Sequence, residues 1–170
     1  MTSDVPYRSV SLVFIVHSLS GAIVLVSGAL QFNRQLLIKN RRLHRLLGRV
    51  YVITVWLASV GGLWMTVFFD VSLVAQAIFG VLALLWFGST TLAFMYARQR
   101  KLTQHRAWMF RSFALSFFFV TFSFWVDGIA GFLPDGAAYP VAVFVSWSLN
   151  LVIAEFLIRR SPIQNKIITL

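Results

Sequence analysis

Two short stretches of the chain repeat a histidine–arginine pair at the start of a long apolar segment. The first stretch runs from His44 to Tyr51, and the second runs from His105 to Ser112. A neutral imidazole can bind a metal or a haem iron, whereas a guanidinium group binds phosphate or carboxylate oxygens. The chemistry that these residue types favour is therefore haem ligation by the histidines or anion binding by the arginines.

Both histidines are expected near the beginning of a helix, because Asn40 precedes one of them and Thr103 the other, and both are good N-cap residues. The positive end of a helix disfavours a protonated imidazole. If the two side chains share one membrane level, His44 and His105 can serve as the axial ligands of a haem b between two helices. The alternative is that each histidine bonds a lipid headgroup or a loop carbonyl group at the membrane surface.

The third histidine, His17, lies inside the first apolar segment. It is expected about 10 Å below the outer surface, from the 1.5 Å rise of each helical residue. That depth separates it from the other two histidines and excludes it as a third axial ligand. His17 could bind a quinone headgroup or relay protons, or it could be a packing residue bonded to a neighbour.

A few charged side chains also fall within the apolar segments, where an unpaired charge is costly. Glu155 is expected to bond either Arg49 or Arg111, as a structural clamp or as a proton or anion site. Neighbouring arginines near helix N-termini would also suit a phosphate group. The predicted ion-pair and anion site comprises Arg45, Arg49, Arg106, Arg111, Asn150 and Glu155.

The composition requires a membrane to position these residues. Of the 170 residues 59% are hydrophobic and only 12% are charged, and the mean hydropathy is +0.80. Soluble domains carry roughly 25% charged residues. Cysteine is absent, which excludes thiolate-ligated metals and iron–sulfur clusters.

Five apolar segments are long enough to span a bilayer. They lie at about 10–32, 46–69, 72–97, 107–124 and 139–158. We therefore predict an all-α, polytopic integral membrane bundle that forms a single domain over residues 1–170.

Five spans divide the charges between the two membrane faces. Fourteen of the 15 basic residues fall on one face, and the acids Asp4, Asp70, Asp127 and Asp135 fall on the other. The positive-inside rule makes the basic face cytoplasmic, so the N-terminus is outside and the C-terminus inside. The net charge of +10 then reflects topology and attraction to anionic lipids of the inner leaflet, not nucleic-acid binding.

The linked motifs of the chain resemble a known family. They are His17-x-x-x-Gly21, Gly28-Ala29-Leu30-Gln31-Phe32, His44-Arg45-x-x-Gly48-Arg49-x-Tyr51, His105-Arg106-x-Trp108-Met109-x-Arg111-Ser112-x-Ala114-Leu115 and Trp147-x-x-Asn150-x-x-x-Ala154-Glu155. Together they resemble the bacterial predicted-membrane-protein family called domain of unknown function 2306. The resemblance implies a helical bundle in the bacterial inner (cytoplasmic) membrane. Ser123 stands where the resemblance leads us to expect an arginine late in the fourth segment.

Three functions are compatible with these patterns. The first is a small b-type haem protein that passes electrons between a quinone and a redox partner subunit. The second is a non-catalytic accessory protein whose Arg/His rim holds anionic lipid or a partner subunit. The third is a small transporter with Asn150, Glu155 and the hydroxyl residues near Thr90 as its polar path.

Overall fold

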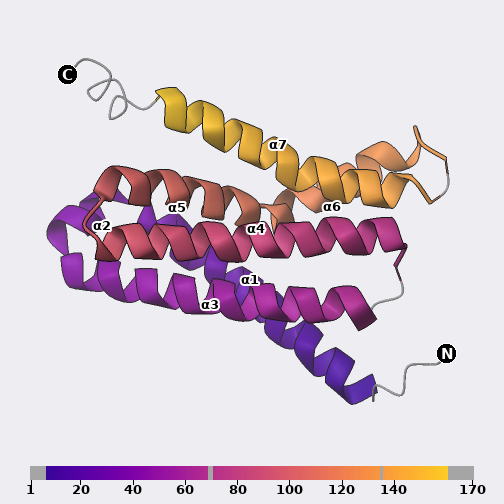
Figure 1. Cartoon of the computed structure of the whole chain (residues 1–170), viewed down its shortest axis with the longest axis horizontal. Coiled ribbons are helices and arrows are strands. Elements are labelled where there is room, and N and C mark those ends of the chain that lie inside the picture. The colour runs from indigo at the N-terminus through magenta and orange to yellow at the C-terminus, as the bar shows by residue number, and fades with distance from the viewer. Residues whose placement is uncertain (1–6, 69–70, 135, 161–170) are drawn as a thin grey trace. The chain divides into compact units, whose positions relative to one another are not determined.

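The computed structural model describes residues 7–68, 71–134 and 136–160, and these residues form helices without any strand. The helices are α1 (Tyr7–Gln31), α2 (Arg34–Lys39), α3 (Arg41–Phe68), α4 (Leu73–Arg98), α5 (Leu102–Ser116), α6 (Phe118–Ala130) and α7 (Ala138–Arg160) (Figure 1). The all-α prediction is therefore confirmed.

Four of these helices are long and apolar enough to cross a membrane, namely α1 from Leu12 onward, α3, α4 and α7. The helices α5 and α6 qualify together as a fifth span, which is bent by 43° at a break between them. The expected polytopic membrane architecture is confirmed, with five spans when α5 and α6 count as one.

The break divides the segment that the sequence predicts as a single helix, 107–124. Phe117 separates α5 from α6, and its carbonyl oxygen accepts hydrogen bonds from Val120 N and Thr121 N at 2.9 and 3.0 Å. On either side, Ser116 and Thr121 donate their hydroxyl groups to carbonyl oxygens four residues earlier. Such back-bonding by serine and threonine bends helices, which accounts for a break that contains neither proline nor glycine.

The chain divides into two compact units, residues 1–84 and 85–170, which we call the N-terminal and C-terminal units. The helix α4 contributes its first half to the N-terminal unit and its second half to the C-terminal unit. The expectation of a single domain stays a prediction.

In the N-terminal unit α1 packs along α3, and the short helix α2 connects them (Figure 1). Its buried side chains are mostly small or β-branched, including Val24, Val55 and Ala58, with Tyr51 as the largest. Small residues allow close approach of helix backbones, which is the main source of packing energy between helices in lipid.

In the C-terminal unit α7 packs against both α5 and α6. Buried hydroxyl side chains are frequent in this unit, with Thr90, Ser112, Ser116 and Ser146 fully buried. Polar side chains that hydrogen-bond across helices therefore contribute to its packing.

The expected separation of charges rests partly on Asp4, Asp70, Asp135 and Lys166, which lie outside the described residues. Phe69, at the end of the second predicted span, also lies outside them. The orientation with the N-terminus outside and the C-terminus inside stays a prediction.

Candidate functional site

The first histidine–arginine stretch lies on the opening turns of α3. The predicted N-cap is confirmed, because Asn40 precedes the helix and its Oδ1 accepts a hydrogen bond from Leu43 N at 3.0 Å. The stretch is also bonded to α1, since Gln31 Nε2 donates to the main-chain oxygen of His44 at 3.1 Å. A side chain from α1 thus holds the backbone of this stretch.

Gly48 explains how Gln31 reaches that backbone. A Cβ atom added at Gly48 would lie 3.5 Å from Gln31 Oε1 and 3.8 Å from its Cδ. The amide group therefore lies directly over the glycine, one helical turn after His44. A side chain larger than alanine at this position would displace Gln31, which assigns the glycine of the motif to close packing of α1 on α3.

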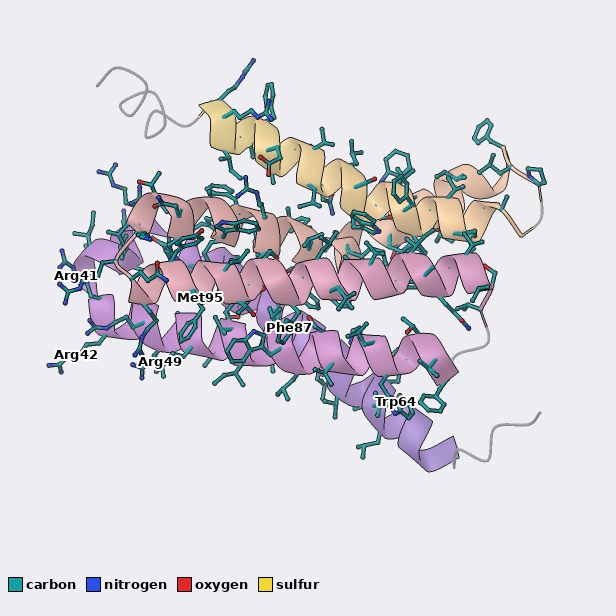
Figure 2. The ribbon with its side chains drawn as sticks, in the orientation of Figure 1. Arg41, Arg42, Arg49, Trp64, Phe87 and Met95 are labelled. Carbon is teal, nitrogen blue, oxygen red and sulfur yellow. The ribbon has the colours of Figure 1, made fainter. Side chains whose placement is uncertain are left out.

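The arginines of this stretch are exposed. Arg45 and Arg49 lie four residues apart on α3 and therefore on one side of the helix. Figure 2 shows Arg49 near the same end of α3 as Arg41 and Arg42. The described residues of the N-terminal unit include no aspartate or glutamate, so no acidic side chain among them pairs with these cations.

His17 lies against α3 further along the same helix pair. Its Nδ1 is 2.9 Å from the carbonyl oxygen of Ala58, which can only accept, so Nδ1 carries a proton and donates it. Cβ atoms added at Gly61 and Gly62 would lie 3.8 Å from His17 Cβ and 3.4 Å from His17 Cε1, respectively. The two glycines make room for the imidazole. The quinone and proton-relay roles of His17 stay predictions.

The second histidine–arginine stretch lies on α5 and is held differently. The helix begins at Leu102 after Lys101, which makes no side-chain capping bond, so the prediction that Thr103 is the N-cap is wrong. The physical reason is the tight connection from α4, in which Lys101 N donates to Tyr96 O at 2.9 Å. That bond closes the turn and leaves Thr103 already inside the helix.

The side chain of His105 makes the link to the neighbouring helix. Its Nδ1 is 2.9 Å from the carbonyl oxygen of Ala93 in α4, and the carbonyl oxygen again requires that Nδ1 donates. In the neutral imidazole this places the lone pair on Nε2, the arrangement of a histidine that binds metal. His44 and His105 belong to different units, and their joint ligation of haem stays a prediction.

The intramembrane carboxylate is paired. Of the two partners expected for Glu155, the structure shows Arg111, whose Nε and Nη2 donate to the two carboxylate oxygens at 2.5 and 3.1 Å. This bidentate pair joins α5 to α7, and the guanidinium carbon also lies 4.6 Å from the ring centroid of Trp108. The arrangement neutralises both charges in place, as expected for ions at membrane depth. Arg106 of the same stretch is exposed.

A buried chain of hydroxyl groups joins α4 to α5, and the sequence reasoning missed it. Trp86 Nε1 donates to Ser116 Oγ at 3.0 Å, and Thr90 Oγ1 lies 2.6 Å from Ser112 Oγ. Since Thr90 Oγ1 also lies 2.8 Å from Trp86 O and has one hydrogen to donate, Ser112 is the donor toward it. Ser112 and Ser116 lie four residues apart, and that spacing was the signal available in the sequence.

Asn150 joins α7 to α6. Its Nδ2 donates to Thr121 Oγ1 at 3.0 Å, just after the break in the fifth span. Of the six residues of the predicted ion-pair and anion site, Arg45 and Arg49 belong to the N-terminal unit and the other four to the C-terminal unit. A common anion site of all six stays a prediction. Asn150 bonds Thr121, Glu155 bonds Arg111, and the remaining arginines are exposed.

Among the described residues there is no group of three or more histidine, cysteine or acidic side chains that could hold a metal ion. Together the apolar helices and the internally paired polar groups define a polytopic α-helical membrane protein.

The comparisons with known proteins agree with this class. The family described as "Predicted membrane protein (DUF2306)" matches residues 14–158, and the chain belongs to this family. Comparison with curated proteins finds no significant match, and comparison with solved structures also finds none.

Proposed function

We propose that this protein binds anionic lipid through a basic rim on its N-terminal unit, and that it does so without catalysis. The basic rim consists of the cationic side chains on α2 and the first turns of α3, which are Arg34, Lys39, Arg41, Arg42, Arg45 and Arg49. The observation that carries the proposal is that all six side chains are exposed and that the described part of their unit contains no acid. Such a surface attracts the phosphate groups of lipids.

The depth of the arginines favours lipid over a soluble anion. Arg49 lies eight residues into α3 from Arg41, which corresponds to about 12 Å along the helix axis. A guanidinium group at that depth extends along the helix toward the headgroup layer, where phosphate groups are concentrated. We place this rim at the cytoplasmic face of the bacterial inner membrane, because the positive-inside rule puts dense clusters of basic residues there.

Lipid exchange tests the proposal with the purified full chain. The protein is reconstituted into nanodiscs that contain phosphatidylcholine and a small fraction of fluorescent phosphatidylglycerol, and retention of the fluorescent lipid near the protein is measured. We expect the double variant R45Q/R49Q to lower that retention at least fivefold, and added salt to weaken the remainder.

The matched control removes two charges from the C-terminal unit with R98Q/R100Q. An equal loss of retention in this control would show nonspecific charge attraction, and would overturn a specific role of the basic rim. Equal retention of fluorescent phosphatidylcholine by the unaltered protein would also contradict the proposal.

A second candidate function, haem-linked electron transfer, is favoured by the proton arrangement of His105. Its Nδ1–H bond to Ala93 O orients the ring and leaves Nε2 able to bind iron. The sequence pattern predicts His44 as the second axial ligand. A haem b bound through His105 would supply one-electron chemistry for exchange with a quinone or a redox partner subunit.

A visible spectrum of the purified protein from haem-supplied cells tests this second function. We expect Soret and alpha bands that appear on reduction and disappear in H105N, which keeps a donor near the Nδ1 position but removes the iron ligand. Absence of these bands from the unaltered protein would contradict it.

A further inference from the structure

The inner face of α7 carries a buried hydrogen-bond donor that the described residues leave without an acceptor. Trp147 is 8% exposed, and its indole Nε1 atom is buried and has no hydrogen-bond partner among them. Burying an N–H group without an acceptor is energetically costly. No bulk water is present in the bilayer core to supply one. A bound oxygen atom would remove this cost.

Asn150 lies one turn further along α7, on the same side of the helix as Trp147. Its Nδ2 uses one hydrogen in the bond to Thr121 Oγ1, and the side chain is only partly buried. The second hydrogen of the amide makes no hydrogen bond to the described residues. Two N–H donors therefore lie near each other on the inner side of α7.

The break in the fifth span lies opposite these donors. Thr121, which accepts from Asn150, donates to the carbonyl oxygen of Phe117 at 3.2 Å, and Phe117 is the residue at which α5 ends and α6 follows. Interrupted helices at membrane depth are where many membrane proteins place their polar binding sites, because the interruption frees backbone groups from the helical pattern.

Aromatic side chains are close to these polar groups in the sequence of α6 and α7. The ring of Phe144 meets Trp147 edge-on with centroids 5.3 Å apart, and Phe122 stacks on Phe118 at 5.2 Å and meets Tyr139 at 5.6 Å. Apolar rings around a few oriented donors are the usual lining of a site for a planar molecule that carries polar oxygen atoms.

We propose that Trp147 and Asn150, with Thr121 behind them, bind the ring carbonyl group of a lipid-soluble quinone. The indole N–H group and the second amide hydrogen of Asn150 donate to the carbonyl oxygen, and the neighbouring aromatic side chains contact the ring. The proposal concerns binding alone and is independent of both the lipid-binding rim and haem.

The indole N–H signals of the six tryptophans provide a direct test. The full chain is labelled with ¹⁵N-tryptophan in detergent micelles, the Trp147 signal is assigned from its loss in W147F, and decylubiquinone is titrated. We expect the Trp147 signal to move downfield in a saturable way as the N–H group gains an acceptor, while the other indole signals do not follow the same curve.

The variant N150L replaces the amide by a branched apolar group and therefore removes both of its N–H donors, including the one that bonds Thr121. We expect it to raise the decylubiquinone dissociation constant at least tenfold, whereas W56F in the N-terminal unit leaves the constant unchanged. A Trp147 indole signal that does not respond to the quinone overturns the proposal. This holds also if exchange of the indole hydrogen with water shows that an internal water molecule is the acceptor. An unchanged constant in N150L overturns it as well, and this arm does not depend on whether W147F folds.

Discussion

The two histidine–arginine stretches begin with the same residues but are connected to their neighbours in opposite ways. In the first stretch the backbone of His44 accepts a bond from Gln31 of α1, and Arg49 is exposed. In the second stretch the side chain of His105 donates to the backbone of α4, and Arg111 is paired with Glu155. The same motif therefore forms an exposed cationic surface in the N-terminal unit. In the C-terminal unit it forms a contact between helices in which the arginine charge is neutralised.

The difference has a simple physical origin. An arginine at membrane depth needs either an acid on a facing helix or access to lipid phosphate. The described residues of the N-terminal unit offer no acid, whereas α7 offers Glu155 to the C-terminal unit. The facing helix, not the motif, therefore decides whether the arginine is paired with an acid.

The largest expected effect comes from removing the carboxylate of the pair. Glu155→Leu leaves Arg111 without its two hydrogen bonds, and we expect a loss of about 2 kcal/mol in unfolding free energy, reduced from the cost of a fully buried pair because both groups are partly exposed. Titration with sodium dodecyl sulfate in mixed micelles measures this free energy.

Arg49→Leu is the matched substitution in the first stretch, and it should change stability by less than about 0.5 kcal/mol, because Arg49 is exposed. The charge swap R111E/E155R should recover part of the loss seen in Glu155→Leu. Equal losses of unfolding free energy in Glu155→Leu and Arg49→Leu would show that the two stretches do not differ in how their arginines are stabilised.

The next largest effect on stability is expected from the hydrogen bond between His105 and Ala93. His105→Leu removes the donor to Ala93 O, and we expect it to cost about 1 kcal/mol, the typical net worth of such a bond. His105→Asn should restore much of this stability, since its amide nitrogen replaces Nδ1. Thermal unfolding of the three proteins in detergent checks the order, and an Asn variant no more stable than the Leu variant would contradict the bond.

In the first stretch the corresponding link depends on Gln31, so Gln31→Leu should cost about as much as His105→Leu. His44→Ala keeps the acceptor of that bond, because the acceptor is the main-chain oxygen. Hydrogen exchange at the start of α3 should be faster in Gln31→Leu than in the unaltered protein. Equal exchange rates in the two proteins would show that Gln31 does not hold this backbone.

A smaller effect on stability is expected in the turn that precedes the second stretch. Arg100 has φ of 60° in the turn before α5, a left-handed conformation that costs an L-residue about 1–2 kcal/mol. Glycine avoids this cost but loses more entropy on folding, so Arg100→Gly should stabilise the chain by about 0.5 kcal/mol. A raised melting temperature in detergent is the readout, and a lowered one would show that the Arg100 side chain contributes more than the strain costs.

The smallest expected effect is at the glycine under Gln31. An added Cβ at Gly48 meets Gln31 Oε1 at 3.5 Å, an ordinary contact, so Gly48→Ala should change stability by less than about 0.5 kcal/mol. Gly48→Leu should displace Gln31 and match the loss in Gln31→Leu. Unfolding titrations of the three variants test this. An unchanged unfolding free energy in Gly48→Leu would show that the position of Gln31 does not depend on the glycine.

Much of the fold could be predicted from the sequence, because membrane insertion depends on local hydrophobicity. The helices α1, α3, α4 and α7 follow directly from apolar runs of spanning length. The break at Phe117 could not be predicted in the same way, since it contains no proline or glycine and depends on hydroxyl bonds to the backbone.

The candidate site was less accessible to sequence reasoning. Charge and membrane depth were enough to expect a partner for Glu155, but the choice of Arg111 required the contact of α5 with α7. The bond of His105 to Ala93 and the buried chain from Trp86 to Ser116 involve residues that share no motif. Such pairs depend on how each helix is rotated about its axis.

The sequence by itself determined that this chain is an α-helical membrane protein of its family, with its cations clustered beside the apolar segments. Composition and segment length suffice for that, because the bilayer selects helices by hydrophobicity alone. Only the tertiary structure decided that the arginines of the first stretch are exposed, whereas in the second stretch Arg111 pairs with Glu155 and His105 bonds Ala93. That outcome depends on which groups the neighbouring helices present, and a motif confined to one helix does not contain this information.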